Sequence, residues 1–322
     1  MPVDQPVDQP VDHDNAYDGL LAGDDVPGAA HWAFGAGPDL GQGADPLAGV
    51  DTSVPDGVEA ADLASYCLML GDDALVLSHR LSEWCSNAPD LEEDIALSNI
   101  GLDLLGQARL LLARAAAADP SCVPVLPEGS PVPGEDALAF FRDDHGFRNV
   151  RLVEGENGDF AETIARLLVF STWRMAVLER LRGSRDQVLA AVAEKGVKET
   201  AYHRDFAGRW FLTLAQGTEE SRRRVLAGLS TVWPLRAELF LTHPVEGRVA
   251  EAGVGVDPAT VIDAVDAVLE QVLTVSQVER PDLAPLSGVS GRFGRDGLHT
   301  EALGRMLATM QVVAREHPMG RW

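Results

Sequence analysis

The sequence predicts an all-α protein whose core is a bundle of four long helices. Apolar residues recur at spacings near three and four over several long segments, which is the period of one buried helix face. Capping and turn signals separate these segments. No run of alternating β-branched residues indicates a sheet. At 322 residues, the chain is long enough to bury a large core.

Residues 1–57 are expected to form a disordered, acidic tail rich in proline and glycine. The tail opens with repeats of the tetrapeptide PVDQ, and 15 acidic residues precede Arg80, the first basic residue of the chain. Proline lacks a backbone donor and like charges extend the chain, so burial cannot offset the entropy lost on ordering it. The helical domain is expected to span residues 58–322.

The first two helices of this domain are expected to form an antiparallel hairpin. One helix begins near Glu59 and ends at residues 86–89, where a proline stops it. Asp90 then caps a second helix that runs to about Ala118. Since the connection is so short, the two helices must be neighbours. The apolar positions expected to face the core on the second helix are Leu91, Ile95, Leu102, Leu105 and Leu112.

A second hairpin is expected further along the chain. The proline-rich residues 119–134 predict a surface loop, and a short helix is expected over 136–150. Long helices over 159–182 and 184–215 follow, because a capping-box-like sequence opens each of them and Gly183 lies between them.

Shorter helices are expected to flank the two hairpins. They should cover residues 218–241, 257–276 and 300–316, with a glycine-rich loop over 288–297 before the last one. Two long hairpins with flanking helices indicate a ferritin-like four-helix bundle.

Composition argues against several functions. The net charge is −24 with no basic stripe, which argues against binding to nucleic acid or to anionic membranes. No window approaches 18 uninterrupted apolar residues, and no secretory signal is evident. The cysteines, Cys67, Cys85 and Cys122, form no CxxC pair, so they indicate thiols of a cytoplasmic protein and not a disulfide framework or a zinc site.

The histidines test for a di-metal centre. Di-iron carboxylate bundles place a Glu on each of two helices and a Glu-x-x-His motif on each of the other two. Among the eight histidines, only His299 has an acid three residues before it, and that pair, Asp296 and His299, lies in the glycine-rich loop. We therefore expect no metal, no cofactor and no catalytic residue in this chain.

On the first hairpin, polar residues should lie where such a bundle would hold its metals. If the turn is centred near residue 88, Asp103 lies level with Asp72 and Asp73. Gly106 then stands where the motif would need a histidine.

On the second hairpin, Glu199 and His203 should lie opposite Arg166 and point inward. We expect Arg166 to pair with Asp103 or Glu199 and so to replace a metal cation in a vestigial polar core. Alternatively, Glu199 and His203 form an exposed pair, and Arg166 bonds only to a glutamate one turn away on its own helix.

Several long segments resemble the C subunits of bacterial ring-1,2-phenylacetyl-CoA epoxidases. The resemblance covers roughly residues 62–322, whereas the N-terminal tail and the loop over 119–134 depart from the family pattern. The segments that carry it are YCLMLGDDALVLSHRLSEWC (66–85), APDLEEDIALSNIGLDLLGQAR (88–109), NGDFAETIAR (157–166), KETAYH (198–203) and GLHTEALGRMLATMQ (297–311).

The resemblance implies a structural subunit of an oxygenase that degrades phenylacetate aerobically. A homologous A subunit would hold the di-iron centre, bind phenylacetyl-CoA and insert oxygen into its ring. A separate NADPH-dependent reductase would supply electrons, and small B and D subunits would complete the system.

Two other functions remain open from the residues alone. The chain could be an enzyme with an atypical metal site built from Asp72 or Asp73 with Asp103, Glu199 and His203. It could also be a freestanding helical protein that binds an acyl-CoA.

Overall fold

The structure is a computed structural model that describes residues 45–320. Over this range the chain is helical apart from turns, loops and one isolated β-bridge between Val289 and Arg292, so the all-α prediction is confirmed there. Most of the segment expected to be a disordered tail, residues 1–44, lies outside the described range, as do residues 321–322.

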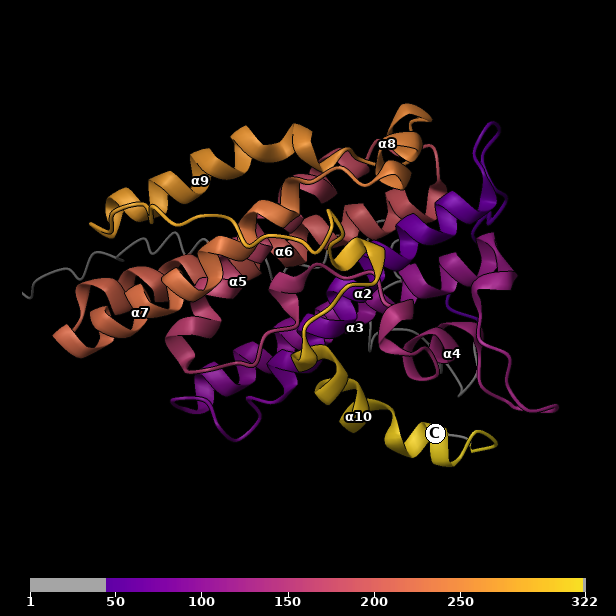
Figure 1. The fold of residues 1–322 in the computed structure, drawn as a ribbon, viewed down its shortest axis with the longest axis horizontal. Coiled ribbons are helices and arrows are strands. Elements are labelled where there is room, and N and C mark those ends of the chain that lie inside the picture. The colour runs from indigo at the N-terminus through magenta and orange to yellow at the C-terminus, as the bar shows by residue number, and fades with distance from the viewer. Residues whose placement is uncertain (1–44, 321–322) are drawn as a thin grey trace, which may run out of the picture. The chain divides into compact units, whose positions relative to one another are not determined.

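Four long helices form the two expected hairpins (Figure 1). In the first, α2 (Ala60–Ser82) lies along α3 (Leu91–Ala118). In the second, α5 (Phe160–Leu181) lies along α6 (Gln187–Gln216), and α6 also contacts α3. The expected helix ranges are confirmed to within a few residues.

Aspartate caps start three of these helices. The side chains of Asp90 and Asp159 each accept a hydrogen bond from the backbone N–H three residues further on, as expected at the starts of α3 and α5. The cap of α6 is Asp186 and not Ser184, which was the expected residue. The Ser184 hydroxyl instead donates to the carbonyl oxygen of Val254, 2.7 Å away.

The flanking helices are α4 (Gly134–Phe140), α7 (Glu219–Val232), α8 (Pro244–Glu251), α9 (Ile262–Val275) and α10 (Glu301–Glu316). Among them, α10 matches the expected range, whereas α4, α7 and α9 are shorter than expected. The helix expected over 136–150 ends early, and α8 was not expected at all.

A proline ends α7 before the expected residue. Pro234 lacks a backbone donor, so the chain tightens into a 3₁₀ turn over Trp233–Phe240 and does not continue as an α-helix to residue 241.

Residues 45–57 pack against the bundle, although they were expected to belong to the tail. Leu47 is 4% exposed and belongs to the hydrophobic core, and the partly buried Val50 and Val54 pack against it. The carbonyl oxygen of Ser53 also accepts a hydrogen bond of 3.2 Å from the buried guanidinium of Arg114. Apolar side chains spaced within an otherwise polar stretch therefore order this part of the chain.

The core face of α3 differs from the expected one. Among the five positions expected to be buried, only Leu112 is buried, and the side facing α2 carries Leu97, Ile100, Leu104 and Leu111 instead. The other four expected positions, Leu91, Ile95, Leu102 and Leu105, are 40–69% exposed. Because α3 is apolar on two sides, its periodicity fits either face, and packing against α2 selects one of them.

Among the helices described, α3 is the one that is long and apolar enough to cross a membrane. More than half of its apolar window is buried inside the bundle. Its length and composition are therefore those of a core helix.

Candidate polar centre of the bundle

Arg174 on α5 lies fully buried among the four long helices. Its Nη1 donates to the carbonyl oxygen of Leu70 on α2 at 3.1 Å, and its Nη2 donates to Oε1 of Gln107 on α3 at 3.2 Å. The Nε2 of Gln107 in turn donates to Oε2 of Glu199 on α6 at 2.9 Å. One chain of hydrogen bonds thus joins all four helices.

The centre is rich in cations. Burial lowers the pKa of Arg174 to about 10, while the negative charges of Asp73 and Glu199 act in the opposite direction, so Arg174 stays protonated at neutral pH. The Nζ of Lys195 lies 3.2 Å from Glu199 Oε1. Glu199 is therefore held between an amide donor and an ammonium group.

These side chains do not fit a di-metal centre. Such a centre needs several carboxylates and two imidazoles facing one another, whereas the Arg174 chain supplies one carboxylate, one amide and a guanidinium that repels a metal cation. Over residues 45–320, the group of three potential ligands with close ligand atoms is Asp90, Glu92 and Glu93, which lies at the exposed start of α3.

Arg166 is buried, as expected, but its partners are different. It donates to the carbonyl oxygen of Gly155, and to that of Glu156 at 2.8 Å. Pairing with Asp103 or Glu199 was therefore a wrong prediction. The alternative was a hydrogen bond from Arg166 to the glutamate one turn away on α5. The guanidinium does not form that bond either, because its acceptors are the two backbone carbonyls.

The direction of helical side chains explains why Arg174 and not Arg166 reaches the centre. Side chains lean toward the N-terminus of their own helix, so the Arg174 guanidinium covers the turn that precedes its own Cα. From there it reaches Gln107, which is bonded to Glu199 of α6. Arg166 lies about two turns earlier on α5 and reaches the loop before the helix.

His203 and Asp103 form a second link between α3 and α6. The Nε2 of His203 lies 3.0 Å from Oδ2 of Asp103, and the imidazole is almost completely buried. His203 therefore points inward, as expected, so the alternative of an exposed pair with Glu199 is wrong. Gly106 is buried on α3 and brings no side chain to the centre.

Asp72 and Asp73 are buried, but each binds segments that cover α2. Asp72 forms an ion pair with Arg142 and accepts a hydrogen bond of 2.8 Å from the backbone N–H of Arg148. Asp73 forms an ion pair with Arg295 at 2.8 Å. Both acids therefore neutralise arginines from distant loops and leave no carboxylate free to join Asp103.

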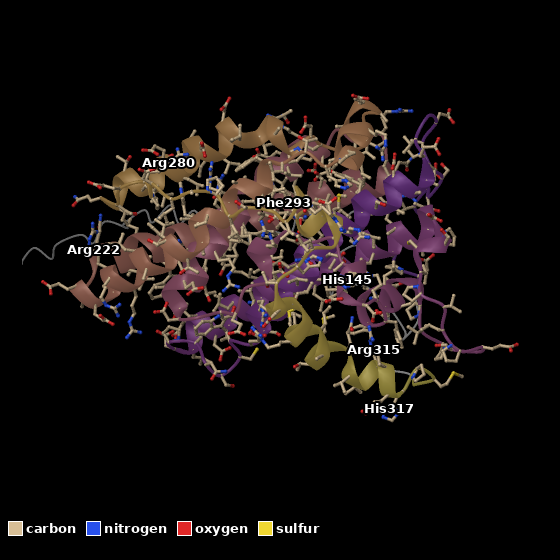
Figure 2. All side chains as sticks on the ribbon, in the orientation of Figure 1. His145, Arg222, Arg280, Phe293, Arg315 and His317 are labelled. Atoms are coloured by element: carbon tan, nitrogen blue, oxygen red, sulfur yellow. The ribbon has the colours of Figure 1, made fainter. Side chains whose placement is uncertain are left out.

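The segment that carries Arg295 is held by further contacts. Phe293, labelled in Figure 2, has its ring centre 5.3 Å from the guanidinium carbon of Arg151. Arg151 also donates from Nε to Glu238 Oε2 at 2.7 Å. Sequence reasoning missed these arginines, and also Arg174 and Gln107. The one available signal was the Asp-Asp pair in an apolar helix, which requires cationic partners.

The atypical metal site proposed from the sequence does not assemble. Over the part of the chain that the structure describes, no group of close potential ligands contains Asp72, Asp73, Asp103, Glu199 or His203. These residues instead fall into four separate polar contacts.

Fold and centre together define an all-helical bundle protein whose four long helices meet at a buried cation. A family model, PaaA_PaaC, described as phenylacetic acid catabolic protein, matches residues 51–322. The chain is also 43% identical over 265 residues to the C subunit of 1,2-phenylacetyl-CoA epoxidase from Escherichia coli (strain K12), and the match covers 81% of this chain and 99% of the relative. The chain therefore belongs to the phenylacetic acid catabolic protein family, among the C subunits of this epoxidase.

Proposed function

We propose that the chain is the non-catalytic C subunit of a phenylacetyl-CoA epoxidase in phenylacetate catabolism. In this proposal its fold is a ferritin-like bundle that supports a catalytic A subunit. The observation that carries the proposal is the buried Arg174, which joins the four long helices through its bonds to Leu70 and Gln107 and the bond from Gln107 to Glu199, where a di-iron bundle would instead need metal ligands.

The proposed complex divides the chemistry between its chains. The A subunit would hold the di-iron centre and bind phenylacetyl-CoA, a reductase would supply electrons from NADPH, and the B and D subunits would complete the assembly. This chain would carry no cofactor and would act in the cytoplasm, without contact to nucleic acid or membrane.

The physical role proposed for this chain is that of a rigid partner. Its centre is fixed by charge-assisted hydrogen bonds between Arg174, Gln107 and Glu199, and its periphery by buried ion pairs of Asp72 and Asp73. A bundle held in this way can present a preformed surface, so little ordering energy is lost when a partner binds.

Co-expression with the A subunit tests the proposal. The two chains are expected to co-purify and to elute together in size-exclusion chromatography at a mass above that of either chain. A chain that elutes alone at every concentration tested, with the A subunit folded and loaded with iron, would contradict the assignment.

A further inference from the structure

The outer side of α3 carries a row of large apolar side chains that the described chain leaves uncovered. The row runs along one side of the helix at spacings of four, seven and three, and we call it the α3 row. Its members are Leu91, Ile95, Leu102 and Leu105, which are 40–69% exposed. Ser98 and Asn99 fall in the gap of seven, and both are polar but uncharged.

Such a row is unusual for a surface in a chain with 24% charged residues. Single exposed leucines are normal, whereas a contiguous apolar patch marks an interaction site. Asp103, which follows Leu102, is bound to His203 and does not interrupt the row. A helix that is apolar on both sides is normally buried on both sides, but the contacts of α3 with α2, α4 and α6 leave the row exposed.

The row stands on a rigid support. The Ser78 hydroxyl of α2 donates to the carbonyl oxygen of Gly101 at 2.7 Å, and Gln107 of α3 donates to Glu199 of α6 at 2.9 Å. Residues Leu91 to Leu105 span about 21 Å along the helix axis. This length suits the apolar centre of an interface with a second helix.

The surroundings of the row favour a protein over a lipid surface. Asp90, Glu92, Glu93 and Asp94 lie at the start of α3, next to Leu91, and anionic headgroups would repel them. The helix also has its other side fixed inside the bundle, so it cannot cross a bilayer. A protein partner can instead place basic side chains opposite these acids.

We propose that the α3 row is the surface on which the catalytic A subunit docks. This inference rests on the proposed function. The matching family model is named jointly for PaaA and PaaC, and the partner that we infer is a second protein of this family. Its docking face would carry aliphatic side chains along a helix, with arginine or lysine near the acidic start of α3.

Charge placed in the row should abolish docking without unfolding the chain. The test variant is the double substitution Ile95→Glu and Leu102→Glu, because both positions are exposed in the lone chain. Matched controls are Val275→Glu at the end of α9 and Val313→Glu on α10, which are exposed to a similar extent. Circular dichroism and thermal unfolding confirm that each variant folds.

Affinity for the purified A subunit is then measured by biolayer interferometry. The double variant is expected to bind at least about 100-fold more weakly than the wild type, and the controls within about 3-fold of it. Equal binding by the wild type and the double variant would overturn the α3 row as the docking face and leave the proposed function intact. Failure of the wild-type chain itself to bind the A subunit would overturn the proposed function as well.

Two further measurements separate other occupants of the row. One is sedimentation of the lone chain with vesicles of phosphatidylethanolamine and phosphatidylglycerol, and the other is the mass of the lone chain in solution. Unchanged A-subunit binding, together with vesicle binding or self-dimerisation that the double variant loses, would overturn the proposal in favour of a membrane or a second copy of the chain.

Discussion

Replacing Arg174 by methionine tests whether the buried guanidinium holds the four helices together. Methionine has a similar length and no charge, so the change removes the hydrogen bonds with little loss of volume. It leaves Gln107 Oε1 without its donor in a dry core, removes the second donor to the Leu70 carbonyl oxygen, and leaves Glu199 with less positive charge around it.

The expected loss of stability follows from these contacts. Each unsatisfied buried acceptor costs about 1–3 kcal/mol, and removing one partner of a buried charge network costs about 3–5 kcal/mol. Burial of the charged guanidinium is itself unfavourable, since it lowers the pKa of Arg174 to about 10. The methionine variant no longer buries this charge, so part of the cost is offset. We therefore expect Arg174→Met to lower the free energy of unfolding by about 3 kcal/mol.

Urea unfolding followed by circular dichroism at pH 7 measures this difference. The matched control is Arg182→Met at the end of the same helix, where the Arg182–Glu194 ion pair is exposed and should contribute less than about 1 kcal/mol. A triple variant that also carries Gln107→Leu and Glu199→Met should recover most of the loss, because none of the three side chains that formed the buried chain of hydrogen bonds is then polar, and Lys195 can turn to solvent. A loss below about 0.5 kcal/mol for Arg174→Met, or no recovery in the triple variant, would refute the reasoning.

Three further changes probe other parts of the bundle. Arg166→Leu strips two backbone carbonyls of their donor and should cost about 2–4 kcal/mol in urea unfolding; an unchanged midpoint would contradict this. Gly228→Ala places a methyl group 2.6 Å from the α5 backbone and should lower the free energy of unfolding by about 1–3 kcal/mol. Gly208→Ala faces open space and should raise the free energy of unfolding by up to about 1 kcal/mol. Thermal unfolding measures both changes. Burial alone would lower the pKa of His299, but the carboxylate of Glu154, 3.5 Å from its Nδ1, raises that pKa above the ordinary 6.5. The stability His299 contributes relative to His299→Gln is therefore fully present below pH 6.5 and lost as the pH rises through the raised pKa, and a difference that grows with pH would contradict this.

The long helices could be predicted because their signals are local. Asp90 and Asp159 cap the helices they were expected to cap. The first helix ends at Ser82, before it reaches the proline that was expected to stop it. The helix α8 escaped notice because it has only eight residues and its N-cap is His243, which is not among the usual capping residues. A helix can therefore be predicted from the sequence where it has several turns and a strong N-cap.

The polar centre could be predicted in kind but not in detail. A buried arginine among inward polar groups was expected, yet the choice between Arg166 and Arg174 depends on hairpin register and on which way the side chain leans. The partners of Asp72 and Asp73 lie 70 and 222 residues further along the chain, at Arg142 and Arg295, so no local pattern could have paired them.

The face of α3 is a third case. Its two apolar sides have the same period, so the sequence alone cannot tell the side that packs on α2 from the side that stays exposed. The expectation that Leu102 and Leu105 are buried is wrong for the lone chain. The same residues become buried if the A subunit docks on them, as proposed.

The distribution of iron between the two subunits tests the central claim most directly. The complex with the A subunit is purified under conditions that retain iron, its chains are separated, and the iron in each is measured by mass spectrometry. The account predicts that the iron stays with the A subunit and that this chain holds far less than one ion per molecule. About two irons per copy of this chain, lost on His203→Ala, would contradict it.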